Sequence, residues 1–232
     1  NPTTHQILLT SIPRDYYVSI AGSTGLKDKL THAGLKGVET SVKTIENLLE
    51  MDINYFLRIN FTSLVEIIDA IGGVDVDNPF EFTADYEENN EHIYYVFPKG
   101  TNHLGGKQAL AYVRERYGLR EGDVARARHQ QQVLSAVIEK MSTSTILTKY
   151  SQILGSIEGD FTTNLSLANI TGFIEWQLDG MPSWTVESMV LTGSDASRKT
   201  ASMPDLYSSV MIPDEEVVQE AIQKINDITG QV

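Results

Sequence analysis

Ala109-Leu-Ala-Tyr-Val-Arg-Glu-Arg116 is the stretch that says most about the fold of this 232-residue chain. Its arginines, Arg114 and Arg116, lie one residue apart. Side chains with that spacing share a face only where the backbone is extended, because strand side chains alternate with period two. Downstream, Arg126 and Arg128 follow a glycine-containing bend and open a predicted helix. Guanidinium groups gathered in this way are typical of phosphate recognition.

The overall charge makes this arginine cluster stand out. The chain carries a net charge of −13 with a pI near 4.7, yet cations outnumber anions from residue 107 to 128. Those cations are Lys107, Arg114, Arg116, Arg120, Arg126 and Arg128, and the anions are Glu115, Glu121 and Asp123. An acidic chain argues against general nucleic-acid binding, which needs a basic field. We therefore expect no nucleic-acid partner.

Other compositional features restrict the chemistry. Cysteine is absent, which excludes disulfides, thiolate metal sites and a cysteine nucleophile. The five histidines show no metal-ligand spacing, so zinc is not expected. No apolar run approaches the roughly 18 residues of a membrane-spanning helix. Because Asn1-Pro-Thr-Thr-His-Gln leads directly into a strand-like segment, we expect a fragment whose true N-terminus lies upstream.

Hydrophobic periodicity predicts strands and helices intermixed along the chain. The predicted strands are 7–11, 54–60, 74–76, 93–97 and 184–191. The predicted helices are 39–51, 61–71 with Thr62 as candidate N-cap, 105–112, 122–141, 145–157, 166–178 and 213–228 with Pro213 in its first turn. The acidic segment 81–92 reads as a surface loop or hairpin. Without repeats or a linker, the pattern favours a single α/β domain over 1–232, a mixed sheet flanked by helices.

The predicted helix from Asp123 changes from polar to apolar along one face. Arg126 and Gln130 lie four residues apart, followed by Val133, Leu134, Val137, Ile138 and Met141. Its N-terminus favours an anion, so a phosphate head with a hydrocarbon tail would fit the gradient. An amphipathic helix packed on the core, with arginines extending to solvent at one end, explains the same pattern.

A further arginine extends the argument to other parts of the chain. Arg14, Arg114 and Arg116 are each predicted at a strand end or in a turn, where α/β folds place binding groups. Each alone would be a surface ion-pair partner worth about 0–1 kcal/mol. Together they indicate a phosphate or pyrophosphate site.

Ordered motifs containing these residues span nearly the whole chain. They are Thr10-Ser-Ile-Pro-Arg-Asp15, Lys29-Leu-Thr-His-Ala33, Gly72-Gly-Val-Asp75, Gly100-x-x-x-Leu104-x-Gly106-x-x-Ala109-Leu-x-Tyr112-x-Arg114-x-Arg116 and Gly122-Asp-x-x-Arg126-x-x-x-Gln130-Gln131. This series resembles the LytR-CpsA-Psr (LCP) domain, and the segment 100–116 is its most specific part. Within the family the chain looks most like the capsule-associated members of streptococcal type.

The resemblance implies a phosphotransferase tethered to the cell membrane at its extracytoplasmic face, whose first strand and membrane anchor lie upstream of Asn1. Such a protein moves a polyprenyl-pyrophosphate-linked glycopolymer, here expected to be capsular polysaccharide, onto peptidoglycan with the assistance of Mg²⁺. The family's pyrophosphate-binding residues correspond to Arg14, Arg114, Arg116, Arg126 and Gln130. Arg14, Asp15 and Arg116 are the implied catalytic residues. Val133, Leu134 and Val137 would line a lipid tunnel between sheet and helices.

The chain departs from the family pattern at two places. The metal-binding aspartates are expected upstream of Asn1, and His129 stands where many relatives have arginine. A phosphate contact made pH-sensitive, or a plain surface histidine, would each account for His129. Asp15 could act as a base or metal ligand, or orient Arg14, and Asp123 reads as a helix cap.

A different class of function remains open. A lipid-binding sensor would hold polyprenyl phosphate and regulate capsule synthesis without transferring a polymer. A transcription factor fits least well, because the chain is acidic and has no recognisable helix-turn-helix.

Overall fold

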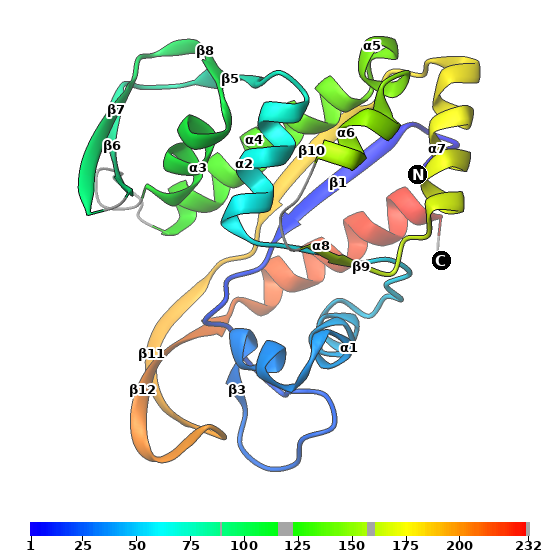
Figure 1. The fold of residues 1–232 in the computed structure, drawn as a ribbon. Helices are drawn as coiled ribbons and strands as arrows, with labels where there is room; N and C mark the ends of the chain where they lie inside the picture. The colour runs from blue at the N-terminus through cyan, green and yellow to red at the C-terminus, as the bar shows by residue number, and fades with distance from the viewer. Residues whose placement is uncertain (89, 116–122, 157–160, 231–232) are drawn as a thin grey trace. The chain divides into compact units, whose positions relative to one another are not determined.

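The computed structural model describes residues 1–88, 90–115, 123–156 and 161–230, and Figure 1 shows its helices and strands. Contacts within the chain form two compact units. Unit 1 combines Asn1–Asn54 with Thr185–Val232, and unit 2 is the intervening Tyr55–Trp184. Both units combine helices with paired strands, so the predicted mixed α/β class is confirmed. The extent of one domain over 1–232 stays a prediction.

Unit 1 is built on a parallel strand pair whose members come from opposite ends of the chain. Its strands are β1 (Gln6–Ser11), β2 (Tyr17–Val18), β3 (Asp28–Lys29), β10 (Thr185–Val190), β11 (Gly193–Thr200) and β12 (Met203–Pro213). β1 and β10 are parallel, from Gln6 opposite Thr185 to Ser11 opposite Val190. β11 and β12 form an antiparallel hairpin, and β2 pairs antiparallel with β3. The parallel register therefore joins the first and last parts of unit 1.

Helices complete the core of unit 1. They are the 3₁₀ helix η1 (Leu30–Lys36), α1 (Val38–Leu49) and α8 (Glu215–Thr229). α8 packs against β1 and α1 through buried Val218, Ile222 and Ile225, which recur at helical spacing. The core residues are Tyr16, Val18, Ile20, Ala33, Leu49, Leu191, Val218, Ala221, Ile222 and Ile225. Burial raises the pKa of Tyr16, whose hydroxyl donates to the Thr192 carbonyl at 2.6 Å.

Unit 2 contains three antiparallel strand pairs and most of the helices that the structure describes. Its strands are β4 (Leu57–Ile59), β5 (Val74–Asn78), β6 (Phe82–Glu88), β7 (Glu91–Phe97), β8 (Gly100–Leu104) and β9 (Phe161–Thr163). Its helices are α2 (Phe61–Ala70), α3 (Gly106–Arg114), α4 (Asp123–Met141), α5 (Ser144–Leu147), α6 (Tyr150–Ser156) and α7 (Leu167–Gly180). The pairs are β4 with β9, β5 with β8 and β6 with β7.

Helix α3 lies at the centre of the unit 2 core. Its residues from Ala109 to Val113 are all buried, and it packs against α2, α4 and the strands β6, β7 and β8. Rings of Phe82 and Phe97 lie 5.3 and 5.1 Å from that of fully buried Tyr112. This packing fixes α3, and with it the arginine at its C-terminal end.

Several predicted elements take a different form. The segment 81–92 belongs to the β6–β7 hairpin, one of the two forms expected. Residues 193–213, where the sequence indicated no strands, form β11 and β12. The single helix predicted over 145–157 is replaced by α5 and α6, because the amide of Lys149 bonds to Ile146 and so interrupts the α-helical series.

The ends of two helices also correct the sequence analysis. Asn60, rather than Thr62, caps α2, because its side-chain oxygen accepts from the amide of Ser63 at 2.8 Å. Pro213 ends β12 instead of opening a helix, and Asp214 caps α8. The predicted stop of α2 at Gly72-Gly73 is confirmed by positive φ angles of 78° and 79°.

Candidate functional site

Arg114 occupies the last turn of α3, not the extended backbone that its spacing from Arg116 suggested. The helix extends two residues beyond the predicted end at Tyr112, and it ends where Glu115 becomes extended. The exposed guanidinium of Arg114 lies over the ring of Phe61, 4.9 Å from its centroid. In the part of the chain that the structure describes, it has no carboxylate partner. A planar cation held on an aromatic face in this way presents its N–H groups to solvent.

An exposed apolar face adjoins this arginine. Leu57 and Ile59 share a face of β4 by strand alternation, and Ile59 lies directly opposite Phe161 of β9. These side chains are 58%, 40% and 43% exposed, and Phe61, which carries Arg114, follows two residues after Ile59. Unit 2 therefore places a cation beside apolar surface. The sequence signal for this face was the alternation of Leu57 and Ile59, which was assigned to a strand but to no function.

Helix α4 supplies Arg126 and Gln130. The helix packs against α3 and β5. The Gln130 amide lies 3.5 Å from the carbonyl of Val113, at the long limit of a hydrogen bond. Gln130 thus reaches Val113, the residue before Arg114. Arg126 lies one turn earlier on α4 and is half-buried. Arg116, predicted to bind pyrophosphate and to act in catalysis, lies outside the described residues.

His129 is buried, which corrects its interpretation as a surface histidine. It is 3% exposed and stacks on Phe82 and Tyr112, with ring centroids 4.9 and 4.3 Å away. Its Nδ1 lies 3.2 Å from the carbonyl of Tyr112. Burial lowers the pKa of His129, and the hydrogen bond to Tyr112 only partly offsets this. The side chain therefore belongs to the core of unit 2.

The residues predicted to line a lipid tunnel lie in different environments. Val133 is buried in the core cluster of unit 2, and Val137 packs against that cluster. Leu134 points to the surface and is 47% exposed. The core-packing alternative therefore accounts for Val133 and Val137, and the tunnel itself stays a prediction.

Arg14 and Asp15 lie in unit 1, in the turn that follows β1, as predicted. Asp15 contacts Arg14 at 3.4 Å and Lys29 at 2.9 Å. Burial acts to raise the pKa of the Asp15 carboxyl, but the hydrogen bond and charge of Lys29, followed by those of Arg14, hold it below its ordinary value. A carboxylate of lowered pKa is a weak base at neutral pH, so this geometry favours the role of orienting Arg14.

Comparison with known proteins identifies the family. The LytR_cpsA_psr family model matches residues 1–224. The chain belongs to the LytR_cpsA_psr family. It is 41% identical over 167 residues to the polyisoprenyl-teichoic acid–peptidoglycan teichoic acid transferase TagU of Bacillus cereus. This alignment covers 72% of this chain and 52% of TagU. The chain thus spans about half the length of the curated relatives it matches.

Solved structures of LytR_cpsA_psr relatives share the fold. Bacillus subtilis TagV superimposes with a TM-score of 0.78 and 30% identity over 97% of this chain and 84% of TagV. TagT bound to LI-WTA gives a TM-score of 0.72 and 28% identity over 99% of this chain and 82% of TagT. The LCP resemblance is therefore confirmed. The capsule-associated streptococcal subtype is not.

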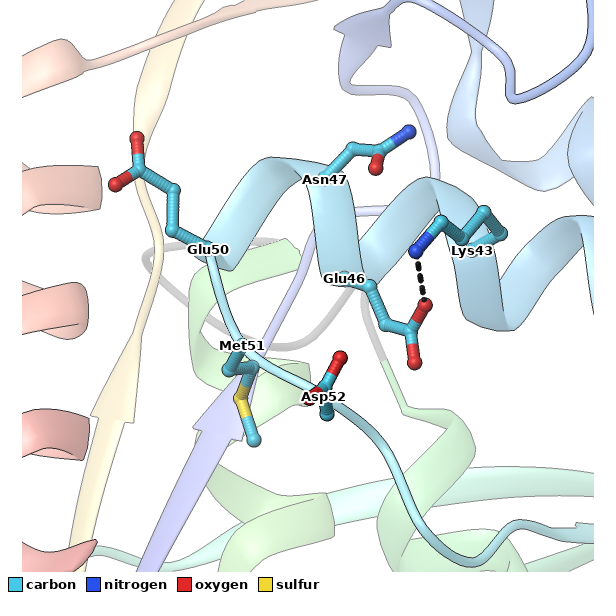
Figure 2. Close-up of a pocket in the computed structure, with 6 residues that line it drawn as sticks. All are labelled: Lys43, Glu46, Asn47, Glu50, Met51 and Asp52. Carbon is cyan, nitrogen blue, oxygen red and sulfur yellow. Dashed lines mark hydrogen bonds and ion pairs between the residues drawn. The ribbon is translucent and has the colours of Figure 1, made fainter. Parts of the chain in front are cut away.

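A polar pocket of about 200 Å³ lies at the C-terminal end of α1 in this LytR_cpsA_psr chain (Figure 2). It is lined by Lys43, Glu46, Asn47, Glu50, Met51 and Asp52. Glu46 uses both carboxylate oxygens internally, because it pairs with Lys43 at 2.9 Å and accepts from the amide of Ile53 at 3.0 Å. None of the predicted site residues lines this pocket, and its lining is mostly polar, unlike a lipid tunnel.

Neither a metal centre nor a membrane span is present in the described part of this LytR_cpsA_psr chain. Across residues 1–88, 90–115, 123–156 and 161–230, no three His, Asp or Glu side chains are grouped to hold a metal ion. No helix there has both the length and the apolar character to cross a bilayer. The family resemblance implies that the metal-binding aspartates lie upstream of Asn1, and the magnesium requirement stays a prediction.

Asp28, His32 and Ser202 form a serine–histidine–aspartate cluster that the sequence did not indicate. Asp28 Oδ1 and Ser202 Oγ lie 2.7 and 2.9 Å from the same ring nitrogen, His32 Nδ1. A catalytic triad uses opposite ring nitrogens for its aspartate and serine. Ser202 is therefore not activated as a nucleophile, and the cluster connects β3 to the β11–β12 hairpin.

Proposed function

We propose that this chain is part of a phosphotransferase that moves a glycopolymer from a polyprenyl-pyrophosphate carrier onto peptidoglycan. The protein would act at the extracytoplasmic face of the cell membrane, to which an N-terminal anchor would tether it. Its lipid-linked donor and its peptidoglycan acceptor are the partners that this function requires. Membership of the LytR_cpsA_psr family supports the assignment.

The observation that carries the proposal is the juxtaposition of Arg114 with the apolar face of unit 2. The pyrophosphate of the carrier would meet the guanidinium that Phe61 holds at 4.9 Å. The first isoprene units would lie on exposed Leu57, Ile59 and Phe161. A lipid-linked pyrophosphate requires a cation for its phosphates and an adjoining apolar surface for its tail. A soluble nucleotide or sugar has no hydrocarbon tail and would not require the apolar surface.

The chemistry is a displacement at phosphorus. The oxygen of an acceptor hydroxyl forms a new bond to the polymer-bearing phosphorus, while the bridging P–O bond to the lipid phosphate breaks and the hydroxyl proton is released. Negative charge grows on the phosphate oxygens, and fixed guanidinium donors stabilise it. Arg114, Arg116 and Arg126 are the proposed donors of unit 2, with Gln130 orienting an oxygen. Arg14, oriented by Asp15, is the proposed donor of unit 1.

Magnesium is the proposed cofactor, and it would neutralise charge on the pyrophosphate. The described carboxylates do not form a site for it, so no role in the reaction is assigned to a residue of this chain through the metal. Asp15 is already engaged by Lys29 and Arg14.

The identity of the transferred polymer is a separate question within this proposal. The motif pattern suggested capsular polysaccharide, whereas TagU and TagV relatives are named as teichoic acid transferases. Both polymers reach peptidoglycan through the same displacement, so Arg114 and its neighbours serve either one. Parallel transfer assays with the two lipid-linked donors, with and without Mg²⁺, decide between them.

Binding measurements on unit 2 residues test the site directly. In calorimetric titrations with geranylgeranyl pyrophosphate, we expect Arg114→Ala to weaken affinity by about 1.5–3 kcal/mol, because a charge-assisted hydrogen bond is lost. Arg116→Ala and Arg126→Ala should have similar effects. Arg58→Ala is the matched control, since Arg58 is an exposed arginine on β4 that points away from Leu57 and Ile59.

The contact between the isoprenoid tail and the apolar face of unit 2 is tested separately. Leu57→Ser with Phe161→Ser should weaken binding of geranylgeranyl pyrophosphate but not of inorganic pyrophosphate, which lacks a tail. Unchanged affinity in all the arginine variants, or equal effects of Arg58→Ala and Arg114→Ala, would remove the basis of the proposal.

The alternative function is a lipid-binding sensor of capsule synthesis that transfers nothing. The same donor site supports it, and the lack of a described metal-binding group in this chain is compatible with it. Transfer of a labelled polymer to peptidoglycan by the chain, or by any longer protein that contains it, would exclude the sensor. Tight donor binding without transfer under all conditions would favour it.

A further inference from the structure

The β11–β12 hairpin ends in a tip that lies against the loop before β3 (Figure 1). We call residues 198–207 together with Leu26 and Lys27 the hairpin tip. The amide of Ala201 donates to the carbonyl of Lys27 at 3.0 Å, so the two segments are in direct contact within unit 1. The hairpin tip has no assigned part in the proposed transfer.

Large apolar side chains are exposed on the hairpin tip. Leu206 is 61% exposed and Tyr207 70%, and Leu26 and Met203 are also solvent-exposed. A single exposed apolar residue is ordinary on a protein surface. Several large apolar residues exposed on the same turn are unusual for a surface that contacts only water, and they indicate an interaction site.

The charge of the hairpin tip is opposite to that of the whole chain. Lys27, Arg198 and Lys199 are exposed there, with Asp205 as the opposing charge. Lys199 lies directly opposite Tyr207 in the hairpin register, so cation and aromatic ring share a face. Among the described residues, none of the three cations forms an ion pair. In a chain of net charge −13, this local positive patch attracts anionic surfaces.

Buried polar contacts hold the hairpin tip in place. Asp28, buried in β3, accepts from the amide of Ser202 at 2.8 Å, and Thr200 between the strands is fully buried. The hydroxyl of Tyr17 donates to the carbonyl of Lys199 at 2.8 Å. The backbone of the hairpin tip is therefore fixed in the folded chain, so docking it requires little ordering of the backbone.

We propose that the hairpin tip docks onto the surface of a membrane that contains anionic lipids. Lys27, Arg198 and Lys199 would lie at the headgroups, and Leu206 and Tyr207 would enter the interface between headgroups and acyl chains. A soluble polyanion would use the cations but would leave the apolar residues in water, so the combination favours a bilayer. This inference goes beyond the proposed function, because it concerns unit 1 and does not require the donor site.

Co-sedimentation with lipid vesicles tests the proposal. The chain should bind vesicles of mixed phosphatidylglycerol and phosphatidylcholine and bind pure phosphatidylcholine far less. Binding should weaken as salt shortens the Debye length from about 10 Å at 0.1 M to about 3 Å at 1 M. Lys199→Glu should lower the partition coefficient by at least about fivefold, since each basic residue near such a surface contributes about that factor.

The apolar contribution is tested with a matched control. Leu206→Ser combined with Tyr207→Ser should lose most vesicle binding, whereas Tyr94→Ser should keep it. Tyr94 has a similar exposure of 65%, but it lies on β7 of unit 2 and is not part of the hairpin tip. Near-ultraviolet circular dichroism shows whether each variant is folded.

A fluorescent label provides a second measurement, which detects docking directly instead of through the loss of vesicle binding. Because the chain has no cysteine, Leu206→Cys and Tyr94→Cys each create a unique attachment point for a polarity-sensitive dye. Vesicles should shift the emission of the dye at position 206 to the blue and leave that at position 94 unchanged. Absence of vesicle binding, equal shifts at both positions, or binding to inorganic polyphosphate but not to vesicles would overturn the proposal.

Discussion

At the scale of single residues, environment decides what a polar side chain does. Arg114 and Arg126 are both arginines of the predicted cluster, yet Arg114 stacks in the open on Phe61 while Arg126 is half-buried on α4. Asp15 is held as a carboxylate by Lys29. His129 is buried, although it is adjacent in sequence to Gln130. Residue type alone distinguishes none of these cases.

His129 leads to a prediction about pH. Its folded-state pKa is lowered by burial, so the unfolded chain binds more protons once the pH falls below the ordinary histidine value of about 6.5. This group therefore contributes stability that is present above that pH and is lost as pH falls towards its folded-state pKa. One group changes the free energy of unfolding by at most about 1.4 kcal/mol per pH unit.

Urea denaturation between about pH 7 and pH 5 measures the effect, since this range extends from just above the ordinary histidine pKa of about 6.5 to well below it. We expect His129→Phe, which keeps the ring stacking, to flatten the loss of stability on acidification. His92→Gln is the control, because His92 is exposed and its pKa is raised by Asp85, which gives a contribution of opposite sign. Identical slopes for the unmodified chain and His129→Phe would contradict this account.

At the scale of elements, helix ends and helix contacts depend on individual positions. The α2 cap is Asn60, two residues before the threonine that the sequence pattern favoured. Asn60 accepts from both the amide and the hydroxyl of Ser63. Position relative to the first helical turn, rather than residue type, selects the cap, because the side chain must reach a free amide.

Substitution of the two candidate caps separates them. Asn60→Ala should lower the free energy of unfolding by about 1 kcal/mol through the loss of the cap. Thr62→Ala, which changes an exposed residue inside the helix, should have little effect. Thermal denaturation of both variants compares them, and a larger loss for Thr62→Ala would show that the cap is wrongly assigned.

Gly105, the N-cap of α3, and Gly106, its first residue, differ in how much space surrounds them. An added Cβ at Gly106 would lie 2.4 Å from the carbonyl oxygen of Val65 and 2.9 Å from the Asp69 carboxylate, whereas at Gly105 the nearest atom is 3.6 Å away. The Gly106 amide also donates to Asp69 at 2.7 Å. Gly106 is thus the point of close approach between α2 and α3.

The adjacent pair provides a test of that approach. Gly106→Ala should destabilise the chain by about 1–3 kcal/mol, because the backbone of α2 has to shift. Gly105→Ala, at a φ of −75°, should be tolerated. Since α3 carries Arg114, Gly106→Ala should also weaken binding of geranylgeranyl pyrophosphate. Equal stability of the two variants in denaturant titrations would argue against close packing at Gly106.

At the scale of the whole molecule, unit 1 is assembled from two segments separated by unit 2. β1 has its partner in β10, and α8 supplies Val218, Ile222 and Ile225 to the same core. Unit 2 has a separate core centred on Tyr112. Stability of residues 1–54 therefore depends on residues after 184.

Truncation tests this dependence. A chain that ends at Trp184 lacks β10, the β11–β12 hairpin and α8, so its first segment loses its strand partner and much of its core. We expect trypsin to cleave rapidly within residues 1–54 of this shortened chain while unit 2 stays protected. Mass spectrometry of the fragments identifies the sites, and the untruncated chain is the control. Protection of residues 1–54 in both chains would show that β10 and α8 are dispensable.

Local periodicity explains how much of the fold could be predicted. The strand at 7–11, the helices at 39–51 and 122–141 and the double-glycine stop at residue 72 all follow from patterns that a short segment carries by itself. The β11–β12 hairpin was missed because β11 is largely polar and most of the hairpin is exposed, so neither strand shows the alternation that marks a half-buried strand. Arg114 was predicted at a strand end or in a turn, because its two-residue spacing from Arg116 outweighed the apolar helix before it.

By itself, the sequence determined the family, the mixed α/β class and the residue types of the candidate site, because motifs and periodicities are local properties of the chain. Only the tertiary structure decided that β1 pairs with β10, that His129 is buried, and that Arg114 lies on Phe61 beside Leu57, Ile59 and Phe161. These features depend on contacts between segments far apart in sequence. Their free energy comes from burying matched surfaces, and no short stretch of residues encodes which surface it will meet.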